Sequence, residues 1–415
     1  MSSINNEQGV NGEREEYQLG EPQTAQESRE EEGVLLPADS EATPAISLVM
    51  PTLNEEEGIR ECIRRAKTAF RELGVQAEII VSDSSTDRTP EIAREEGAIV
   101  VEPDGKGYGY AYQYAFEKAR ADVIAMGDAD TTYDFEELPK LYELVANGDA
   151  DMAMGSRLEG EIKPGAMPTL HQYVGNPLLT KFLNTFYGAG VSDAHSGMRV
   201  FTQEAWEAMG CETTGMEFAS EMIMQAGAAD LQIVEEPIVY HEREGEETLE
   251  SFRDGWRHVR FMLLNAPGYL FSVPGMVLGL FGMLVMASVA FGVPGTSVTL
   301  GANSMIAGSL FTIVGYQVAS MGIFATISGD PIRKPGDPVT EYVVERLNLE
   351  RGATAGLVVG GVGATYAGYL VVQWVQSGFT SVPFTVGSIL AFTAIVIGVQ
   401  TVFSAFFMSA VASSR

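Results

Sequence analysis

The chain has 415 residues, enough for about two to three domains, and 56 Asp and Glu residues against 26 Lys and Arg residues give it a formal charge of −30. A surface this acidic repels nucleic-acid phosphates, which excludes a nucleic-acid-binding protein. Two cysteines provide no disulfide framework, and the four histidines lack the spacing of a metal site.

The first 43 residues are rich in Glu, Gln, Ser, Asn and Gly and contain few aromatic residues. Such a segment cannot bury enough apolar surface to offset its chain entropy, so residues 1–43 are predicted to form a disordered acidic tail. The acidic start and the late first apolar run do not fit a signal peptide.

Beyond the tail, short apolar runs alternate with helical periodicity. Strands are expected at residues 46–50, 78–81, 98–101, 122–126 and 152–154, and helices at 56–73, from Thr89 onward, 108–119 and 136–146. This rhythm predicts an α/β fold, a mostly parallel sheet with helices on both faces.

The expected strand at 122–126 ends in two carboxylates, Asp128 and Asp130. Ligands of open α/β sheets bind outside the carboxyl ends of the strands. Two hard oxygen ligands there suit a divalent cation, Mg²⁺ or Mn²⁺, that also holds a diphosphate. A second such triplet, Asp149 to Asp151, precedes a strand and is expected at the opposite edge, so position distinguishes the two.

Other polar residues are expected at the same edge: Pro51–Glu55, Asp83, Lys106 and Ser156–Arg157. Turns often use such residues in any case. Together they would supply what a nucleoside diphosphate needs: acceptors for base and ribose, a lysine near phosphate, and a metal bridge.

The motifs occur in a fixed order. They are Pro51-Thr52-Leu53-Asn54-Glu55, Asp83, Gly105-Lys106-Gly107, Asp128-Ala129-Asp130, Gly155-Ser156-Arg157 and Asp193-Ala194-His195-Ser196-Gly197. This series, over about residues 46–260, resembles the family-2 glycosyltransferases with a GT-A (Rossmann-like) fold, most closely the dolichyl-phosphate hexose synthases. The acidity further resembles proteins of halophilic archaea.

The resemblance implies roles for single residues. The nucleotide sugar would be bound by Pro51, Leu53, Asn54, Glu55, Asp83, Lys106, Asp128 and Arg243, the last from a segment, Arg243-Glu244-Gly245-Glu246-Glu247, that clamps the donor diphosphate. Asp128 and Asp130 would hold the metal. Arg157 and Arg199 would position the acceptor phosphate, and Asp193 would orient the acceptor or act as a base. Many relatives have Leu-Gln after the second Asp; Thr131-Thr132 stands here, which leaves a third protein ligand open.

The C-terminal part is apolar. Residues 250–268 form a basic, amphipathic stretch suited to a membrane surface. Spans are expected at 269–291, 303–327, 353–375 and 384–411, each long enough for the ~20 residues of a bilayer crossing. The connection 328–351 carries four basic residues, so the positive-inside rule predicts a cytoplasmic catalytic domain (residues 44–249) and cytoplasmic termini. No span has an ionisable residue near its centre, which favours an anchor over a transporter.

The resemblance implies a multi-pass cell-membrane enzyme for protein glycosylation that moves a hexose from UDP-glucose or, second, GDP-mannose to dolichyl or polyprenyl phosphate with inversion. A transferase that extends a lipid-linked glycan remains open. A processive polysaccharide synthase usually carries Q-x-x-R-W, which Gly255-Trp256-Arg257-His258 does not match. A non-catalytic membrane protein is the third alternative.

Overall fold

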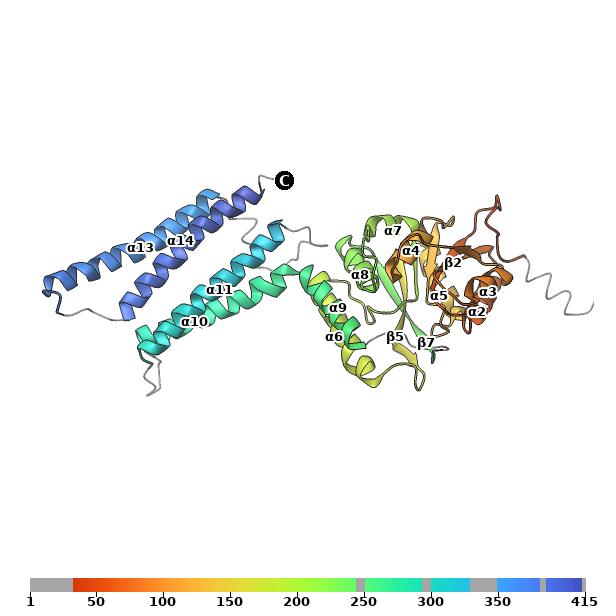
Figure 1. The fold of residues 1–415 in the computed structure, drawn as a ribbon, viewed down its shortest axis with the longest axis horizontal. Helices are drawn as coiled ribbons and strands as arrows, with labels where there is room; N and C mark the ends of the chain where they lie inside the picture. Colours follow the sequence, from red (N-terminus) through yellow and green to blue (C-terminus); the bar gives the residue numbers. More distant parts are fainter. Residues whose placement is uncertain (1–32, 244–250, 293–299, 329–348, 381–385, 413–415) are drawn as a thin grey trace, which may run out of the picture.

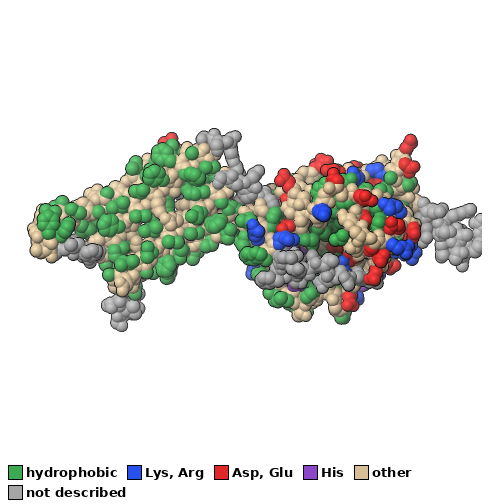
Figure 2. All heavy atoms as spheres, in the orientation of Figure 1, with side chains coloured by type: hydrophobic (Ala, Val, Ile, Leu, Met, Phe, Trp, Pro, Cys, Tyr) green, Lys and Arg blue, Asp and Glu red, His purple; other side chains and the backbone are tan. Residues whose placement is uncertain are grey.

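The computed structural model describes residues 33–243, 251–292, 300–328, 349–380 and 386–412. An α/β domain forms one end of the molecule, and a bundle of long helices forms the other (Figure 1). Charged side chains gather on the α/β domain, whereas the visible surface of the long helices is mostly hydrophobic (Figure 2). The predicted division into a catalytic domain and a membrane domain follows this change of surface.

The α/β domain is built on a single mixed sheet. Its strands are β1 (Ile46–Thr52), β2 (Ala77–Asp83), β3 (Ile99–Val101), β4 (Val123–Met126), β5 (Met152–Ile162), β6 (Arg199–Thr202) and β7 (Ile233–Tyr240). Their order is β3-β2-β1-β4-β6-β5-β7. Among these strands β6 runs antiparallel to both neighbours, β4 and β5, and the other pairings are parallel. The mostly parallel sheet is confirmed; β6 and β7 were not predicted.

Helices cover both faces of the sheet. They are α2 (Ile59–Leu73), α3 (Thr89–Glu95), α4 (Tyr108–Phe116), α5 (Leu138–Ala146), α6 (Asn176–Tyr187), α7 (Gln203–Met209), α8 (Phe218–Ala228) and α9 (Ser251–Leu264). Strand β1 shows why apolar runs suit this position: Leu48 and Met50 enter the core under α2, α3 and α5, while Val49 enters the core under α4, α6, α7 and α8. A strand buried on both faces needs a continuous apolar sequence.

Local sequence signals set the ends of two expected helices. Gly74 ends α2 in the left-handed conformation, at φ 65°, as glycine at this position predicts. A helix was expected from Thr89 onward, and Thr89 is the first helical residue of α3; the Asp87 carboxylate accepts its N–H at 3.0 Å. The helix therefore starts as expected, and the carboxylate that accepts its first N–H lies two residues before it.

The N-terminal boundary of the folded domain differs from the expected residue 44. Val34 and Leu36 are buried, and the backbone N–H of Leu36 donates to the carbonyl of Ala77 at the start of β2. Arg120 also donates to the carbonyls of Pro37 and Ser40. Residues 33–43 are thus packed on the domain, because a short apolar run inside the polar tail adds to the sheet. Residues 1–32 lie outside the described part.

Strand β5 is longer than the expected 152–154. It continues to Ile162 beside β7, with a shift of register between Ser156 and Glu161. Gly160 permits this close pairing, since a Cβ there would stand 1.9 Å from the carbonyl oxygen of Ile238. Such irregularities bend a strand and redirect its side chains, and Arg157 lies within this one.

Within the described residues of the C-terminal part, four helices are long and apolar enough to cross a membrane. The candidate spans are Gly268–Phe291, Ala302–Ile327, Leu349–Gln376 and Val386–Val411, close to the expected ranges. They belong to η3 (Gly268–Ser272) with α10 (Val273–Phe291), α11 (Ala302–Ser328), α13 (Leu349–Gln376) and α14 (Val386–Ala412).

Glycines set how closely these helices approach one another. A Cβ on Gly315 of α11 would stand 2.3 Å from the backbone nitrogen of Gly279 on α10, and one on Gly398 of α14 would stand 2.4 Å from that of Gly360 on α13. Small residues allow such backbone contact, which is the usual basis of helix association in lipid.

One buried ion pair anchors the N-terminal segment to the sheet. Glu78 is fully buried, and its carboxylate accepts hydrogen bonds from the Nε of Arg120, at 2.7 Å, and from the Oγ of Ser47, at 2.6 Å. Arg120→Ala leaves this charge without its cation. We expect a loss of about 3 kcal/mol, the lower end for breaking a buried pair because the Ser47 bond remains. The thermal midpoint should fall by about 6 to 12 °C.

Lys163→Ala is the control, since Lys163 and Glu161 form an exposed pair worth less than about 1 kcal/mol. Equal midpoints for the two purified variants in detergent would contradict this account of Glu78.

Candidate active site

The carboxyl ends of β1 and β2 lie side by side, with Thr52 paired to Asp83 in the register. The hydroxyl of Thr52 donates to Asp83 Oδ1 at 2.7 Å. Asn54, at φ 60°, joins the two loops that follow: its N–H donates to Ser85 Oγ at 2.7 Å, and its Oδ1 accepts from the N–H of Thr86 at 2.9 Å. The structure thus places the expected residues of these two loops together.

Asp128 lies just beyond the end of β4, beside β1. Two phenols donate to its Oδ1: Tyr108 at 2.9 Å and Tyr112 at 3.3 Å. Its Oδ2 lies next to Gly197, where an added Cβ would stand 2.9 Å away. Hydrogen bonds therefore hold Oδ1 of this carboxylate. Oδ2 has room beside it because residue 197 is glycine and has no side chain.

Asp130 is fixed by its own turn. Thr132 donates to Asp130 Oδ1 through its hydroxyl, at 2.6 Å, and through its N–H, at 3.2 Å. Thr131 adopts φ 63°, and Gly58 leaves room for the turn, since a Cβ there would lie 3.0 Å from the carbonyl of Ala129. Where many relatives have glutamine, Thr132 acts as a donor that orients Asp130.

Arg243 links Asp130 to Glu55. Its Nη2 is 2.5 Å from Glu55 Oε1, and its Nη1 is 3.6 Å from Asp130 Oδ2. Burial raises the pKa of Glu55 to about 7, with Arg243 opposing and both aspartates adding to the rise. Burial, followed by the charge of Asp130, raises the pKa of Asp128 to about 6. Three carboxylates therefore share one guanidinium.

This donor set fits a divalent cation. The carboxylates repel one another and are partly desolvated, and both aspartates offer the hard oxygen ligands that Mg²⁺ or Mn²⁺ prefers. In the described part of the chain, no group of three or more His, Cys, Asp or Glu side chains could hold a metal ion. The remaining ligand positions would fall to another molecule, as in a site shared with a diphosphate.

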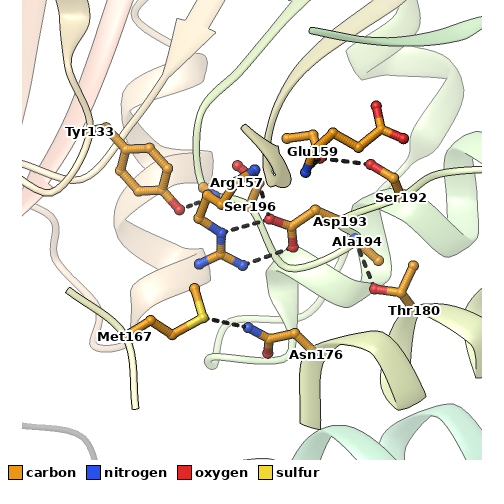
Figure 3. Close-up of polar contacts among 12 residues, drawn as sticks. Tyr133, Arg157, Glu159, Met167, Asn176, Thr180, Ser192, Asp193, Ala194 and Ser196 are labelled. Carbon is orange, nitrogen blue, oxygen red and sulfur yellow. Dashed lines mark hydrogen bonds and ion pairs between the residues drawn. The ribbon is translucent and has the colours of Figure 1, made fainter. Parts of the chain in front are cut away.

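Arg157 and Asp193 form a buried, two-point ion pair (Figure 3). Arg157 Nε donates to Asp193 Oδ2 at 2.7 Å, and Nη2 donates to Oδ1 at 2.9 Å. Burial is the largest single influence and opposes ionisation of Asp193, but the charge of Arg157 and its hydrogen bonds, with a smaller contribution from His195, together outweigh it, so the pKa of Asp193 is lowered. The carboxylate of Glu235 on β7 supports the loop by accepting the N–H groups of Ser192 and Asp193.

Arg199 does not occupy the position expected of a phosphate ligand. It is fully buried in β6, and its guanidinium donates to the carbonyls of Ser196, at 3.0 Å, and Ala194, at 3.1 Å. A side chain without solvent access cannot contact an incoming substrate, so the prediction that Arg199 binds the acceptor phosphate is wrong. It holds the loop that carries Asp193.

The other expected donor residues lie around this centre. Pro51 is within β1, and Leu53 is 56% exposed. Lys106 is exposed on the loop before α4. In that loop Gly107 adopts φ 127° and leaves no space for a Cβ, which would stand 2.2 Å from the carbonyl oxygen of Thr214.

Sequence reasoning missed several residues of the site: Tyr108, Tyr112, Tyr133 and Glu235. Tyr133 accepts the N–H of Gly197 on its phenol oxygen at 2.6 Å (Figure 3). Tyr108 and Tyr112 are four residues apart on a predicted helix next to a glycine-rich loop, which is a signal that could have been read. Glu235 has no comparable signal, because its partners come from a distant loop.

Two families match the sequence. Residues 47–210 match the family described as Glycosyl transferase family 2, and residues 328–412 match the one described as Glycosyltransferase family 2 C-terminal transmembrane region.

Relatives support the same family. The chain is 61% identical over 375 residues to the low-salt glycan biosynthesis hexosyltransferase Agl6 of Haloferax volcanii, with 90% of this chain and 91% of the relative covered. It is 35% identical over 213 residues to a dolichyl-phosphate hexose transferase of the same organism, over 51% of this chain and 89% of the relative.

Among solved structures, glucosyl-3-phosphoglycerate synthase from Mycobacterium tuberculosis, in complex with Mn²⁺, UDP and glucosyl-3-phosphoglycerate, is similar at 21% identity. The match covers 54% of this chain and 80% of that one, with a TM-score of 0.44. The two family matches and the 61% identical relative show that the chain belongs to glycosyltransferase family 2: it is a multi-pass membrane glycosyltransferase of the GT-A fold, and its acidity agrees with the halophilic archaeal origin of its relatives.

Proposed function

We propose that the enzyme transfers a hexose from UDP-glucose or GDP-mannose to dolichyl or polyprenyl phosphate at the cytoplasmic membrane face, with inversion at the anomeric carbon. The observation that carries the proposal is the cluster of Glu55, Asp128 and Asp130 around Arg243, at the carboxyl edge of the sheet. Relatives named as a hexosyltransferase and a dolichyl-phosphate hexose transferase support it.

On the donor side, Asp128 and Asp130 would hold the divalent cation. When bound, the cation supplies Lewis-acid stabilisation of the charge that develops on the leaving diphosphate. Arg243 lies between Glu55 and Asp130, and a guanidinium can exchange carboxylate oxygens for phosphate oxygens in the same two-point geometry. Lys106 adds an exposed positive charge beside this edge.

On the acceptor side, the nucleophile is a phosphate oxygen. The second pKa of a phosphate monoester is about 6, so the acceptor is ionised at neutral pH and needs little help from a base. The oxygen attacks the anomeric carbon and forms the new C–O bond, while the electron pair of the broken C–O bond stays on the diphosphate.

Arg157 is the best-placed residue to position this phosphate. Its Nε and Nη2 are fixed by Asp193, whereas its Nη1 makes no hydrogen bond to the described residues. The Asp193 carboxylate is paired with Arg157 and its pKa is lowered, so it is a weak base. We therefore assign Asp193 the role of orienting Arg157.

The lipid would approach along an exposed apolar surface on η2 (His171–Gly175) and α6. This surface consists of Leu170, Tyr173, Val174 and Leu178, each more than half exposed. Helix α6 lies beside α9 and η3: Tyr187 donates to the carbonyl of Met262, and Phe186 stacks on Tyr269 at 4.2 Å between ring centroids (Figure 1). An exposed apolar patch at the start of a helix whose other end contacts the first candidate span suits the bilayer surface.

A second candidate is transfer to a glycan that is already linked to a lipid. The name of the 61% identical relative, a glycan biosynthesis hexosyltransferase, leaves the acceptor open. The mass of the lipid product distinguishes the two reactions.

Asp130→Ala should reduce transfer at least about 100-fold, because it removes one of two metal ligands. Membranes are incubated with a panel of nucleotide sugars, polyprenyl phosphate and Mn²⁺ or Mg²⁺, and the lipids are analysed by mass spectrometry. Asp149→Ala is the matched control, because Asp149 is the exposed residue of the second triplet, at the opposite edge. Wild-type product levels from membranes that contain the Asp130 variant would refute the metal assignment.

Gly197→Ala should also lower transfer, by about tenfold or more, with little change in the thermal midpoint. The added methyl group would stand 2.9 Å from Asp128 Oδ2, too close for an ordinary contact, and a side-chain carboxylate gives way more easily than the backbone, so Oδ2 would be pushed out of its fixed position. Gly33→Ala is the control, since an added Cβ there would have no neighbour within 4 Å. Unchanged transfer by the Gly197 variant would show that Asp128 Oδ2 has no role at the reacting centre.

Leu178→Glu should raise the KM for the lipid acceptor about tenfold, since a charge on this face opposes contact with the bilayer. Nucleotide binding, measured by calorimetry, should not change. Leu178→Met keeps the apolar character and serves as the control. If the Glu variant has the wild-type KM, α6 does not face the lipid.

A further inference from the structure

Helix α4 carries tyrosine at every second position from 108 to 114. Tyr108 and Tyr112, four residues apart, share one face of the helix. Their hydroxyls converge on a single atom, Asp128 Oδ1, at 2.9 and 3.3 Å. Tyr110 and Tyr114 occupy the opposite face, where their rings stack on each other with centroids 6.3 Å apart.

The inward pair is held rigidly. Tyr112 is fully buried and stacks on Phe218 of α8, with 5.9 Å between ring centroids. Gly109 fixes the height of the helix, since a Cβ there would stand 2.4 Å from the carbonyl oxygen of Thr213. The side chain of Gln113 donates to the same carbonyl at 2.8 Å. Neither phenol can therefore follow Asp128 if its carboxylate rotates.

A carboxylate can present either oxygen by rotation about its last side-chain bond. Two donors on one oxygen remove this freedom, and hydrogen bonds to an ionised acceptor are about twice as strong as neutral ones. The other oxygen, Oδ2, faces the space beside Gly197. The two contacts together select which oxygen Asp128 offers.

We propose that Tyr108 and Tyr112 are positioning residues that fix Asp128 Oδ1, so that Oδ2 is the oxygen available to the cation. This inference rests on the proposed function. Groups that hydrogen-bond a metal ligand from behind typically change metal affinity by about 10- to 100-fold. The phenols should therefore govern the metal requirement of the enzyme and contribute little to the rate at saturating metal.

The test uses Tyr108→Phe, Tyr112→Phe and the double variant in the full-length enzyme, which keep the rings and remove only the hydroxyls. Tyr114→Phe is the matched control, the same change on the opposite face of the same helix. Calorimetry measures the binding of UDP and GDP over a range of Mn²⁺ concentrations, and transfer assays give kcat at saturating Mn²⁺.

We expect the double variant to need at least about tenfold more Mn²⁺ for half-maximal nucleotide binding, and each single variant about threefold more. The kcat at saturating Mn²⁺ should stay within about threefold of wild type, and Tyr114→Phe should match wild type throughout. If the double variant does not fold, Tyr108→Phe, at the less buried of the two positions, decides the question.

Two results would overturn the inference, and they are distinguishable. A wild-type Mn²⁺ requirement in the folded tyrosine variants would show that the phenols serve packing alone, while the proposed function would stand. If wild-type enzyme shows no Mn²⁺-dependent binding of UDP or GDP, the proposed function and this inference fall together.

Discussion

The catalytic edge depends on the repulsion among three partly buried carboxylates, which a single guanidinium opposes. Glu55, Asp128 and Asp130 come from the ends of two neighbouring strands, and Arg243 joins two of them. Such an arrangement costs stability when the protein is alone, and the cation and diphosphate of the proposed reaction would recover that energy on binding. Natural proteins often place locally unfavourable interactions where they bind ligands.

The parallel part of the sheet explains why much of this edge was predictable. The carboxyl ends of β1, β2 and β4 meet there, so motifs at strand ends, such as Asp83 and Asp128, must be neighbours once the strands are placed. Strand β6 does not follow this rule. It enters antiparallel between β4 and β5, and its position in the middle of the sheet buries Arg199, which a strand-by-strand reading cannot foresee.

Contacts between distant segments account for the remaining differences. The partner of Arg157 is fixed by a loop that β6 and β7 bring into place, so its pairing with Asp193 has no signal in spacing. The predicted start of the folded domain at residue 44 differs from the structure for another reason. Composition averages over a window, and the few apolar residues around Val34 and Leu36 are outweighed by the polar residues before them. These few residues nevertheless suffice to pair the segment with Ala77, the first residue of β2.

Helix α8 contacts three segments: helix α9, the loop that carries Asp193, and the segment that holds α4. The Oγ of Ser220 lies 2.8 Å from Nδ1 of His258 on α9. It also lies 3.3 Å from Nε2 of His195, in the loop that carries Asp193. Burial lowers the pKa of His195 to about 3, so this contact is a neutral hydrogen bond at working pH. The next residue, Glu221, accepts the N–H of Thr213, whose carbonyl holds α4 and thus the two phenols behind Asp128. One helix therefore supports both the loop that carries Asp193 and the phenols behind Asp128, which suits the proposed reaction, in which one substrate would arrive from the bilayer and the other from water.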